Sequence, residues 1–168
     1  VQERMIHHIW TQVSENDGNL IEMVNGYRKS QGKDPVIIEV PELPFPRIPY
    51  CDAIEIVKSG GGDIQWGDDI ESHHCDIIAS KYPGFHFIPR WPMSMKPFYI
   101  HHKEGEFGSG GGQLSRGFDL NYGRDEMTSG GAREHRVEVL EQNLRDVELD
   151  PQDFTFYTDG FRYGAPPH

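Results

Sequence analysis

Four short runs between residues 85 and 129 are rich in aromatic or β-branched residues and are bounded by glycine or proline. Such runs are typical of β-strands. Consecutive strands with short links usually pair with one another, so the runs predict an antiparallel sheet, and this succession constrains the fold more than any other feature of the chain. The expected strands are FHFIPRW (85–91), KPFYIHH (96–102), RGFDLNY (116–122) and DEMTS (125–129).

Helical patterns lie on both sides of these runs. Apolar residues at helical spacing predict an amphipathic helix over 1–13, and a second helix follows from Leu20 to Tyr27. CDAIEIVKSGGG predicts a short helix that ends at glycine, and a further helix is expected after WGDD, with Asp68 or Asp69 near its N-terminus. Near the C-terminus we expect one helix with the apolar stripe Val137, Leu140, Leu144 and Val147, and another with Asp150 as N-cap and Pro151 in its first position.

Together these elements predict an α+β fold, an antiparallel β-sheet flanked by helices, with no internal repeat. We expect a helical segment over 1–35, the sheet with its connecting helices over 36–130, and C-terminal helices over 131–168. Within the middle part, VIIEV (36–40) is a further β-prone run, and GEFGSGGGQ (105–113) has the composition of a flexible loop.

The charge balance limits the possible partners. The chain has 27 acidic and 16 basic residues and a net charge of −11, the opposite of the usual balance in a nucleic-acid-binding domain. Its two cysteines, Cys51 and Cys75, form no CxxC motif, which favours a reducing setting over a disulfide framework. No stretch approaches the roughly 18 apolar residues of a membrane span, and the N-terminus lacks the apolar core of a signal peptide. We therefore expect a cytoplasmic protein without a membrane partner.

Several familiar motifs are absent. Histidine pairs occur at 7–8, 73–74 and 101–102, but adjacent side chains point in different directions and the spacing of a structural zinc site is missing. Polar surface or partly buried histidine is the favoured interpretation. KSGGGD lacks the order of a P-loop, and GSGGG lacks the βαβ surroundings of a dinucleotide-binding turn, so these glycines predict turns.

The segment DEMTSGGAREH (125–135) is the strongest candidate for a site. Glu126 and Ser129 offer hard oxygen donors that suit Mg²⁺, and Arg133 could bind a carboxylate or phosphate with both arms of its guanidinium. Gly130 and Gly131 would let a ligand or the backbone approach closely. Composition alone leaves an edge strand that runs into a solvated turn equally open. On a regular strand the Glu126 and Ser129 side chains point to opposite faces, so a shared ion requires a bulge or a strong twist.

FDLNYGRDEMTSGGAREH resembles the class II aminoacyl-tRNA synthetases of the aspartate and asparagine group. Their signature is an Asp-containing strand followed by Glu-(apolar)-Ser/Thr-Ser-Gly-Gly/Ala-x-Arg-x-His. Four further segments resemble the family in the same order, which makes five ordered matches, and the resemblance covers about residues 1–168 and is most secure over 43–168. KPFY and APPH favour aspartyl enzymes of archaeal type. The four segments are FPRIPYCDAIEIV, WGDDI, WPMSMKPFYI and LDPQDFTFYTDGFRYGAPPH.

The resemblance implies the family's reaction, in which ATP and Mg²⁺ activate aspartate to aspartyl-adenylate and the acyl group passes to tRNA. It implies that Glu126 and Ser129 contact ATP and hold the Mg²⁺ that bridges its phosphates. It also implies that Arg133 binds the side-chain carboxylate or amide of the amino acid. Catalysis is alignment plus charge stabilisation, so no acid–base residue is expected. The remaining implied pocket residues are Lys96, Phe98 and Tyr99, which line or support it, and Asp119, which shapes it.

The motifs correspond to the stretch between the family's second and third motifs. We therefore expect a partial catalytic domain that does not form the adenylate alone, with tRNA binding and homodimer formation supplied by other segments of a longer protein. Open alternatives are an asparagine–tRNA ligase, a synthetase-derived paralogue that forms asparagine, and a non-catalytic synthetase-like interaction module. Retention of Glu126, Ser129 and Arg133 argues against the last, because a scaffold needs neither a magnesium pair nor an anion-binding arginine.

Overall fold

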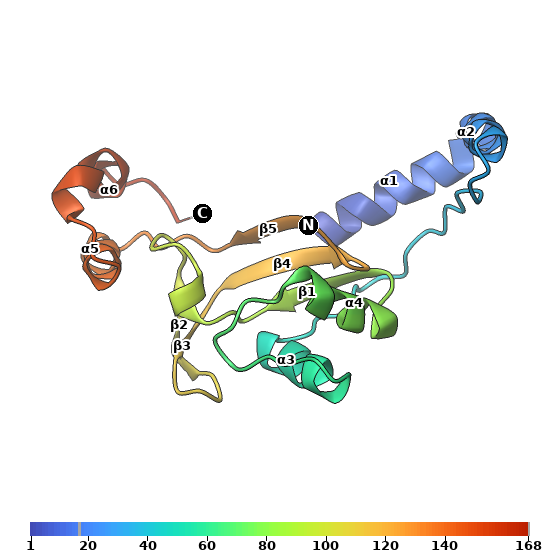
Figure 1. Ribbon diagram of the computed structural model, residues 1–168. Coiled ribbons are helices and arrows are strands. Elements are labelled where there is room, and N and C mark those ends of the chain that lie inside the picture. Colours follow the sequence, from blue (N-terminus) through green and yellow to red (C-terminus); the bar gives the residue numbers. More distant parts are fainter. Residues whose placement is uncertain (17, 168) are drawn as a thin grey trace. The chain divides into compact units, whose positions relative to one another are not determined.

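The computed structural model describes residues 1–16 and 18–167, and the chain divides after Pro46 into two compact units. The first unit contains helices α1 (Gln2–Asn16) and α2 (Gly18–Ser30) (Figure 1). The mixture of helices and antiparallel strands confirms the predicted α+β class. The second unit contains α3 (Tyr50–Ser59), α4 (Ser72–Lys81), β1 (Phe85–Pro89), η1 (Met93–Met95), β2 (His102–Phe107), β3 (Gln113–Ser115), β4 (Gly117–Tyr122), β5 (Asp125–Gly131), α5 (Val137–Asp146), η2 (Pro151–Phe154) and α6 (Thr155–Arg162).

In the first unit, an extended segment follows α2 and is held by side chains of both helices. The Asn25 side chain on α2 donates to the carbonyl of Val36 at 3.0 Å and accepts from its N–H at 2.7 Å. Farther along, a ring nitrogen of His7 on α1 lies 2.8 Å from the carbonyl oxygen of Pro41. The predicted β-run at 36–40 is therefore wrong, because helix side chains take the place of a neighbouring strand.

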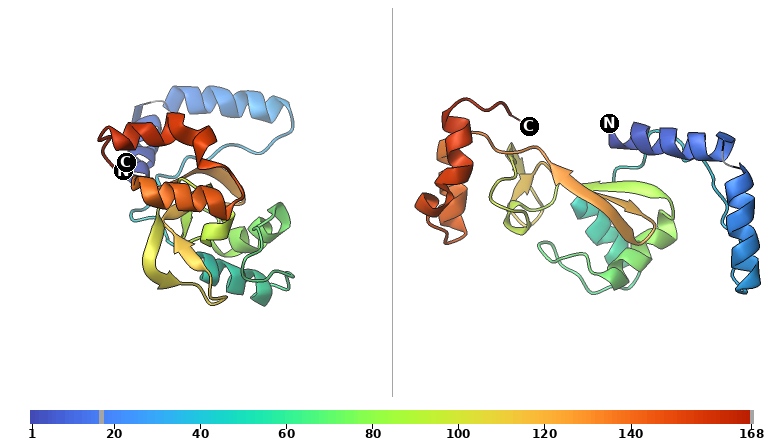
Figure 2. Two further views of the ribbon diagram at one scale, coloured as in Figure 1. Left: turned by 90° about the vertical axis from the view of Figure 1, so that its left-hand side faces the viewer. Right: turned by 90° about the horizontal axis from the view of Figure 1, so that it is seen from above.

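In the second unit, β1, β4 and β5 form a three-stranded antiparallel sheet with β4 at its centre. β1 pairs with β4 in an unbroken register from Phe85↔Tyr122 to Pro89↔Phe118. Helices α3 and α4 lie on one face of this sheet (Figures 1 and 2). The expected strands at 85–91, 116–122 and 125–129 are thus confirmed, with ends that differ by one or two residues.

The main core lies between that sheet face and the two helices. Side chains alternate along a strand, so Ile88 of β1 projects to the helix side together with its partner Asp119. Tyr50, the first residue of α3, is fully buried, and its ring centre lies 4.8 Å from that of Trp91. Its hydroxyl donates to the carbonyl of Asp68, which ties α3 to the turn before α4. The buried members of the core are Ile48, Tyr50, Ala53, Ile54, Val57, Ile64, Ile78, Ile88 and Trp91.

Helix α4 begins later than the position of Asp68 and Asp69 suggested. Glu71 is its N-cap: the Glu71 carboxylate accepts from the N–H of His74, and the His74 ring accepts from the N–H of Glu71 at 3.2 Å. This reciprocal arrangement is a capping box. The Asp68 carboxylate instead stabilises the preceding turn by accepting from the N–H of Gln65 at 2.8 Å.

The expected strand at 96–102 is wrong over most of its length. Residues 97–100 form a turn that is closed by the Ile100 N–H, which donates to the carbonyl of Pro97 at 3.0 Å. Proline cannot donate a hydrogen bond to a sheet, which explains why a β-prone run leaves the ladder here. Strand β2 starts only at His102 and pairs with β3.

The glycine-rich stretch 105–113 is not an open, flexible loop. It forms the tip of the β2–β3 hairpin, where the Gly108 N–H donates to the carbonyl of Gly112 at 2.8 Å. Gly108, Gly110 and Gly112 all lie against the indole of Trp66, so closely that a Cβ atom on any of them would collide with the ring. These glycines therefore allow the hairpin to pack on the turn that precedes α4.

Helices α5 and α6 pack side by side at the end of the second unit (Figure 2). Leu140 and Leu144 are fully buried as predicted, whereas Val147 at the end of the stripe is exposed. Asp150 is an N-cap as predicted, accepting from the N–H of Gln152 at 2.9 Å, although the helix that it caps is the short 3₁₀ helix η2. Within the described ranges, no helix has both the length and the apolar character required to cross a bilayer.

We predict that Gly110→Ala destabilises the second unit, because its new methyl group would force the Trp66 ring or the hairpin to move. Thermal and urea unfolding should show a loss of about 1–3 kcal/mol. Gly84→Ala is the matched control, since a Cβ at Gly84 meets nothing within 4 Å. Equal stability of the two variants would contradict the close packing of the hairpin on Trp66.

Candidate functional site

The β4–β5 ladder contains one extra residue on β5. Asp119 pairs with Ser129 and Asn121 pairs with Glu126, so the register shifts by one and Met127 is left unpaired. Paired residues of an antiparallel ladder project to the same face, and Asp119 and Asn121 are two residues apart on β4. This β-bulge therefore turns Glu126 and Ser129 to the same face of the sheet, which is the condition that a shared ion imposes.

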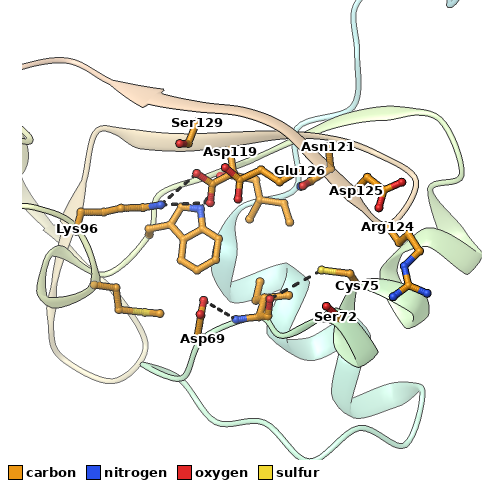
Figure 3. Close-up of a pocket in the computed structure, with 14 residues that line it drawn as sticks. Asp69, Ser72, Cys75, Lys96, Asp119, Asn121, Arg124, Asp125, Glu126 and Ser129 are labelled. Carbon is orange, nitrogen blue, oxygen red and sulfur yellow. Dashed lines mark hydrogen bonds and ion pairs between the residues drawn. The ribbon is translucent and has the colours of Figure 1, made fainter.

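That face lines a cavity of about 630 Å³ between the sheet and the turn into α4 (Figure 3). Sites for small ligands usually enclose about 300–1,000 Å³. Ile70, Ile88, Trp91 and Met95 supply its apolar surface. The polar lining residues are Asp69, Ser72, Cys75, Lys96, Asp119, Asn121, Arg124, Asp125, Glu126 and Ser129.

Lys96 and Asp119 form a largely buried ion pair on the cavity wall. The Lys96 Nζ atom lies 3.1 and 3.2 Å from the two carboxylate oxygens of Asp119 (Figure 3). It also lies 4.2 Å from the centre of the Trp91 ring, a cation–π distance. Burial raises the pKa of the Asp119 carboxyl above its ordinary value, and the neighbouring ammonium only partly offsets that effect. Each charge of this pair therefore depends on the other.

The cavity lining has an excess of negative charge. Its second cation, Arg124, is also paired, with a guanidinium nitrogen 2.8 Å from a carboxylate oxygen of Asp76. In the part of the chain that the structure describes, no basic side chain forms an ion pair with Asp125 or Glu126. The exposed carboxylates at this edge of the cavity can therefore accept a cation from solution.

The donors at this edge suit Mg²⁺ that is shared with a phosphate. Within residues 1–16 and 18–167, no group of three or more His, Cys, Asp or Glu side chains could hold a metal ion by itself. Mg²⁺ in phosphate-binding sites usually takes only one or two protein carboxylates and completes its shell with phosphate oxygens and water. Glu126 and Ser129, exposed on one face, offer a carboxylate and a hydroxyl for that purpose.

Arg133 lies outside this lining, two residues beyond the end of β5. Its guanidinium carbon lies 4.4 Å from the centre of the Tyr99 ring, and its backbone bridges that of Ile100. Burial raises the pKa of the nearby Tyr157, while the positive charge of Arg133 lowers it. Among the described residues, no carboxylate forms an ion pair with Arg133, so its donors can bind an anionic ligand.

Glu134, the next residue, is fully buried. Its carboxylate accepts from the backbone N–H groups of His135 and Arg136, and from Nε and Nη2 of the Arg136 side chain at 2.9 and 2.8 Å. Burial would raise the pKa of this carboxyl, but the hydrogen bonds from Arg136 and His135 lower it to about 2. A second carboxylate, that of Glu104, also binds the Arg136 guanidinium.

The predicted site residues fall into two places. Lys96, Asp119, Glu126 and Ser129 line the cavity. Tyr99 and Arg133 stack on one another beyond β5, and Phe98 packs in an aromatic cluster with Phe154 and Tyr157, at ring-centre distances of 5.3 and 5.7 Å.

Sequence reasoning missed two parts of the site. Asn121 lines the cavity beside Asp119, and the two-residue alternation along β4 could have identified it. The Glu134–Arg136 pair had no signal in the sequence, because Glu134 is buried beside the turn at 97–100, where its N–H donates to the carbonyl of Tyr99.

Gly130 and Gly131 allow close packing against the neighbouring strand β4. A Cβ on Gly131 would lie 3.0 Å from both the carbonyl oxygen of Arg116 and the Cα atom of Gly117, and one on Gly130 would lie 3.1 Å from the Phe118 ring. The sequence left open whether a ligand or the backbone comes close to these glycines. In the structure, the backbone of β4 lies against Gly131 and the Phe118 ring lies against Gly130.

The sequence was also compared with known protein families. The family described as tRNA synthetases class II (D, K and N) matches the sequence over residues 1–168. The chain belongs to this family. The resemblance predicted from the five ordered motifs is therefore confirmed.

Curated relatives of this class II synthetase chain include archaeal aspartate–tRNA ligases. The aspartate–tRNA(Asp) ligase of Thermoplasma acidophilum is 41% identical over 133 residues, which cover 79% of this chain and 30% of that protein. The aspartate–tRNA(Asp/Asn) ligase of Archaeoglobus fulgidus is 34% identical over 168 residues, which cover 100% of this chain and 36% of that protein. The chain thus spans about a third of the length of these relatives.

Solved synthetase structures share the fold. The aspartyl-tRNA synthetase from Entamoeba histolytica matches with a TM-score of 0.82 at 24% identity, over 99% of this chain and 33% of that one. The asparaginyl-tRNA synthetase from Pyrococcus horikoshii complexed with asparaginyl-adenylate matches with a TM-score of 0.77 at 24% identity, over 99% and 36%.

We predict that Lys96→Met strongly destabilises the second unit near neutral pH, because it leaves the Asp119 charge buried without a partner. Urea unfolding should show a loss of about 3–5 kcal/mol. Removing the ammonium also raises the pKa of Asp119 further, so the loss should shrink as the pH falls and Asp119 becomes neutral.

The control is Lys58→Met, which removes an exposed partner of Glu55 at 3.2 Å and should cost at most about 1 kcal/mol. A loss in Lys96→Met that equals the control, or that does not change with pH, would show that the pair is not required to neutralise Asp119.

Proposed function

We propose that residues 1–168 form part of the catalytic domain of an aspartate–tRNA ligase. The reaction joins the α-carboxylate of aspartate to the α-phosphate of ATP with release of pyrophosphate, and the aspartyl group then passes to the 3′ end of tRNA. The carrying observation is the β-bulge at Met127, which places Glu126 and Ser129 on one face of the cavity. The archaeal relatives support the choice of reaction.

The polar edge of the cavity supports binding of Mg-ATP. When bound there, Mg²⁺ would neutralise phosphate charge and draw electron density from the reacting phosphorus. Glu126 and Ser129 would hold it and thereby orient the phosphates. Lys96 and Asp119 would keep the adjoining wall in place, because their ion pair joins β4 to the Lys96 ammonium, which lies over the Trp91 ring. Alignment and charge stabilisation of this kind can supply most of the rate enhancement of a transfer that needs no acid or base.

The position of Arg133 favours an amino-acid substrate with a negatively charged side chain. Its guanidinium rests on Tyr99 and has no carboxylate partner among the described residues, so both arms can bind the side-chain carboxylate of aspartate. A hydrogen bond to a charged group contributes about 1.5–3 kcal/mol, roughly twice a neutral one. The same fork binds the amide of asparagine less strongly.

An asparagine–tRNA ligase is the second candidate. The fold also matches asparaginyl-tRNA synthetases, with TM-scores of 0.78 and 0.77 against 0.82 for the aspartyl enzyme. The unpaired charge of Arg133 favours the aspartate assignment over this alternative.

The whole protein's other partners are part of the same proposal. We infer that it acts on tRNA in the cytoplasm as a homodimer. The net charge of −11 argues that residues 1–168 contribute little to holding tRNA, whose phosphates require a basic surface.

We predict that Glu126→Gln in the full-length protein weakens the response of ATP–pyrophosphate exchange to Mg²⁺. The half-saturating Mg²⁺ concentration should rise about tenfold or more, because an ionised ligand is lost. Glu138→Gln on the exposed side of α5 removes the same charge away from the cavity and should leave the Mg²⁺ response unchanged. An unchanged response in Glu126→Gln would remove the metal role of this residue.

We predict that Arg133→Ala raises the KM for aspartate in the same exchange assay by roughly a hundredfold, because the variant loses about two charge-assisted hydrogen bonds to the substrate. The KM for ATP should change little. Arg145→Ala, which removes an exposed arginine paired with Glu141 on α5, is the control. The assay should be run with aspartate and with asparagine, and preferred activation of asparagine by the unmodified protein would replace the aspartate assignment.

A further inference from the structure

We propose that Glu134 and Arg136 position Arg133 for the amino acid. This inference rests on the proposed role of Arg133 and goes beyond it. The ion pair between the buried Glu134 and the partly exposed Arg136 fixes the backbone that carries both Arg133 and Tyr99, and it leaves the donors of Arg133 available to a ligand.

The backbone around Arg133 is joined to the turn at 97–100 by a short ladder. The His101 N–H donates to the carbonyl of Ala132 at 2.8 Å, and the Glu134 N–H donates to the carbonyl of Tyr99 at 2.9 Å. Arg133 itself forms an antiparallel bridge with Ile100. The arginine and the ring on which it rests therefore sit on two paired segments, and their stacking requires those segments to stay in register.

The Glu134 side chain closes the end of this ladder. Its Oε1 atom accepts from the N–H groups of His135 and Arg136, both at 3.0 Å, so it holds the turn that follows Arg133. The same carboxylate binds the Arg136 guanidinium through Nε and Nη2. With no exposed surface, Glu134 cannot touch a substrate in the cavity, and its influence must pass through the backbone.

The ion pair also selects which arginine is available. Arg133 and Arg136 are three residues apart on either side of Glu134. The Arg136 guanidinium binds both Glu134 and Glu104, so these two carboxylates are already paired. Arg133 instead stacks on Tyr99 with no carboxylate partner in the described ranges. An arginine whose donors are not satisfied within the protein can give them to a substrate carboxylate.

The test is steady-state ATP–pyrophosphate exchange in the full-length protein with Glu134→Gln. Glutamine preserves the volume but loses the charge that binds Arg136. We expect the KM for aspartate to rise about tenfold while the KM for ATP stays within about twofold. Arg136→Lys, which keeps the charge but cannot bind with two arms, is the second variant and should act in the same direction.

Val57→Ala is the control for lost stability. Val57 is fully buried in α3, in the core on the α3–α4 side of the sheet, and truncating it should lower the melting temperature without changing the KM for aspartate. If Glu134→Gln and Arg136→Lys behave like Val57→Ala, with lower melting temperatures and an unchanged KM, the positioning role is wrong.

A double-mutant cycle separates this inference from the proposed function. In an Arg133→Ala background, Glu134→Gln should change the KM for aspartate by less than about twofold, because the group that it positions is gone. A full additional tenfold effect in that background would overturn the positioning role while leaving the binding role of Arg133 intact. If Arg133→Ala alone leaves the KM unchanged, the binding role fails and the positioning role fails with it.

Discussion

The β-bulge at Met127 determines which side chains of β5 face the cavity. Side chains alternate along a regular strand, so residues separated by three positions face opposite ways. One extra residue restores a common face, and the spacing Glu-x-x-Ser puts a carboxylate and a hydroxyl on one wall of the cavity. The unpaired Met127 is exposed and needs no packed environment. The polar side of the cavity therefore depends on a local break in the ladder between β4 and β5.

The charges around the site are divided between structure and ligand binding. Lys96 is paired with Asp119 and Arg124 with Asp76, so the cations of the cavity lining are used within the protein. Beyond β5, Arg136 is used in the same way by two carboxylates. Among the described residues, what remains is a negative edge at the start of β5 and, just after its end, the cation Arg133 without a carboxylate partner. This polarity suits a reaction that brings a metal-bound polyphosphate and an acidic amino acid together.

Local sequence was sufficient to predict the strands of the three-stranded sheet, but it was not sufficient to predict the segments around that sheet. The runs at 85–89 and 117–122 became strands because alternation and β-propensity agree there. The stretch 96–100 has the same propensity, but Pro97 starts a turn and Phe98 is drawn into an aromatic cluster with α6. For the candidate site, the carboxylate of Glu126 and the hydroxyl of Ser129 could be named from their chemistry, and both line the cavity. The burial of Glu134 could not, because Glu134 lies beside a turn far away in the sequence, where its N–H donates to the carbonyl of Tyr99.

The two walls of the cavity are stabilised in different ways. The sheet wall is held by ladder hydrogen bonds, which position Asp119 and Asn121 with little freedom. The opposite wall contains Asp69 and the start of α4, and it is a turn without a ladder of its own.

Two aromatic side chains hold this turn in place of ladder hydrogen bonds. The Tyr50 hydroxyl binds the backbone of the turn at Gly67 and Asp68, and the Trp66 ring is enclosed by the glycines of the β2–β3 hairpin. A loop that carries ligand-binding groups needs such anchors, because loops otherwise sample many conformations. The glycines of the hairpin, although they do not line the cavity, are therefore part of what gives it its shape.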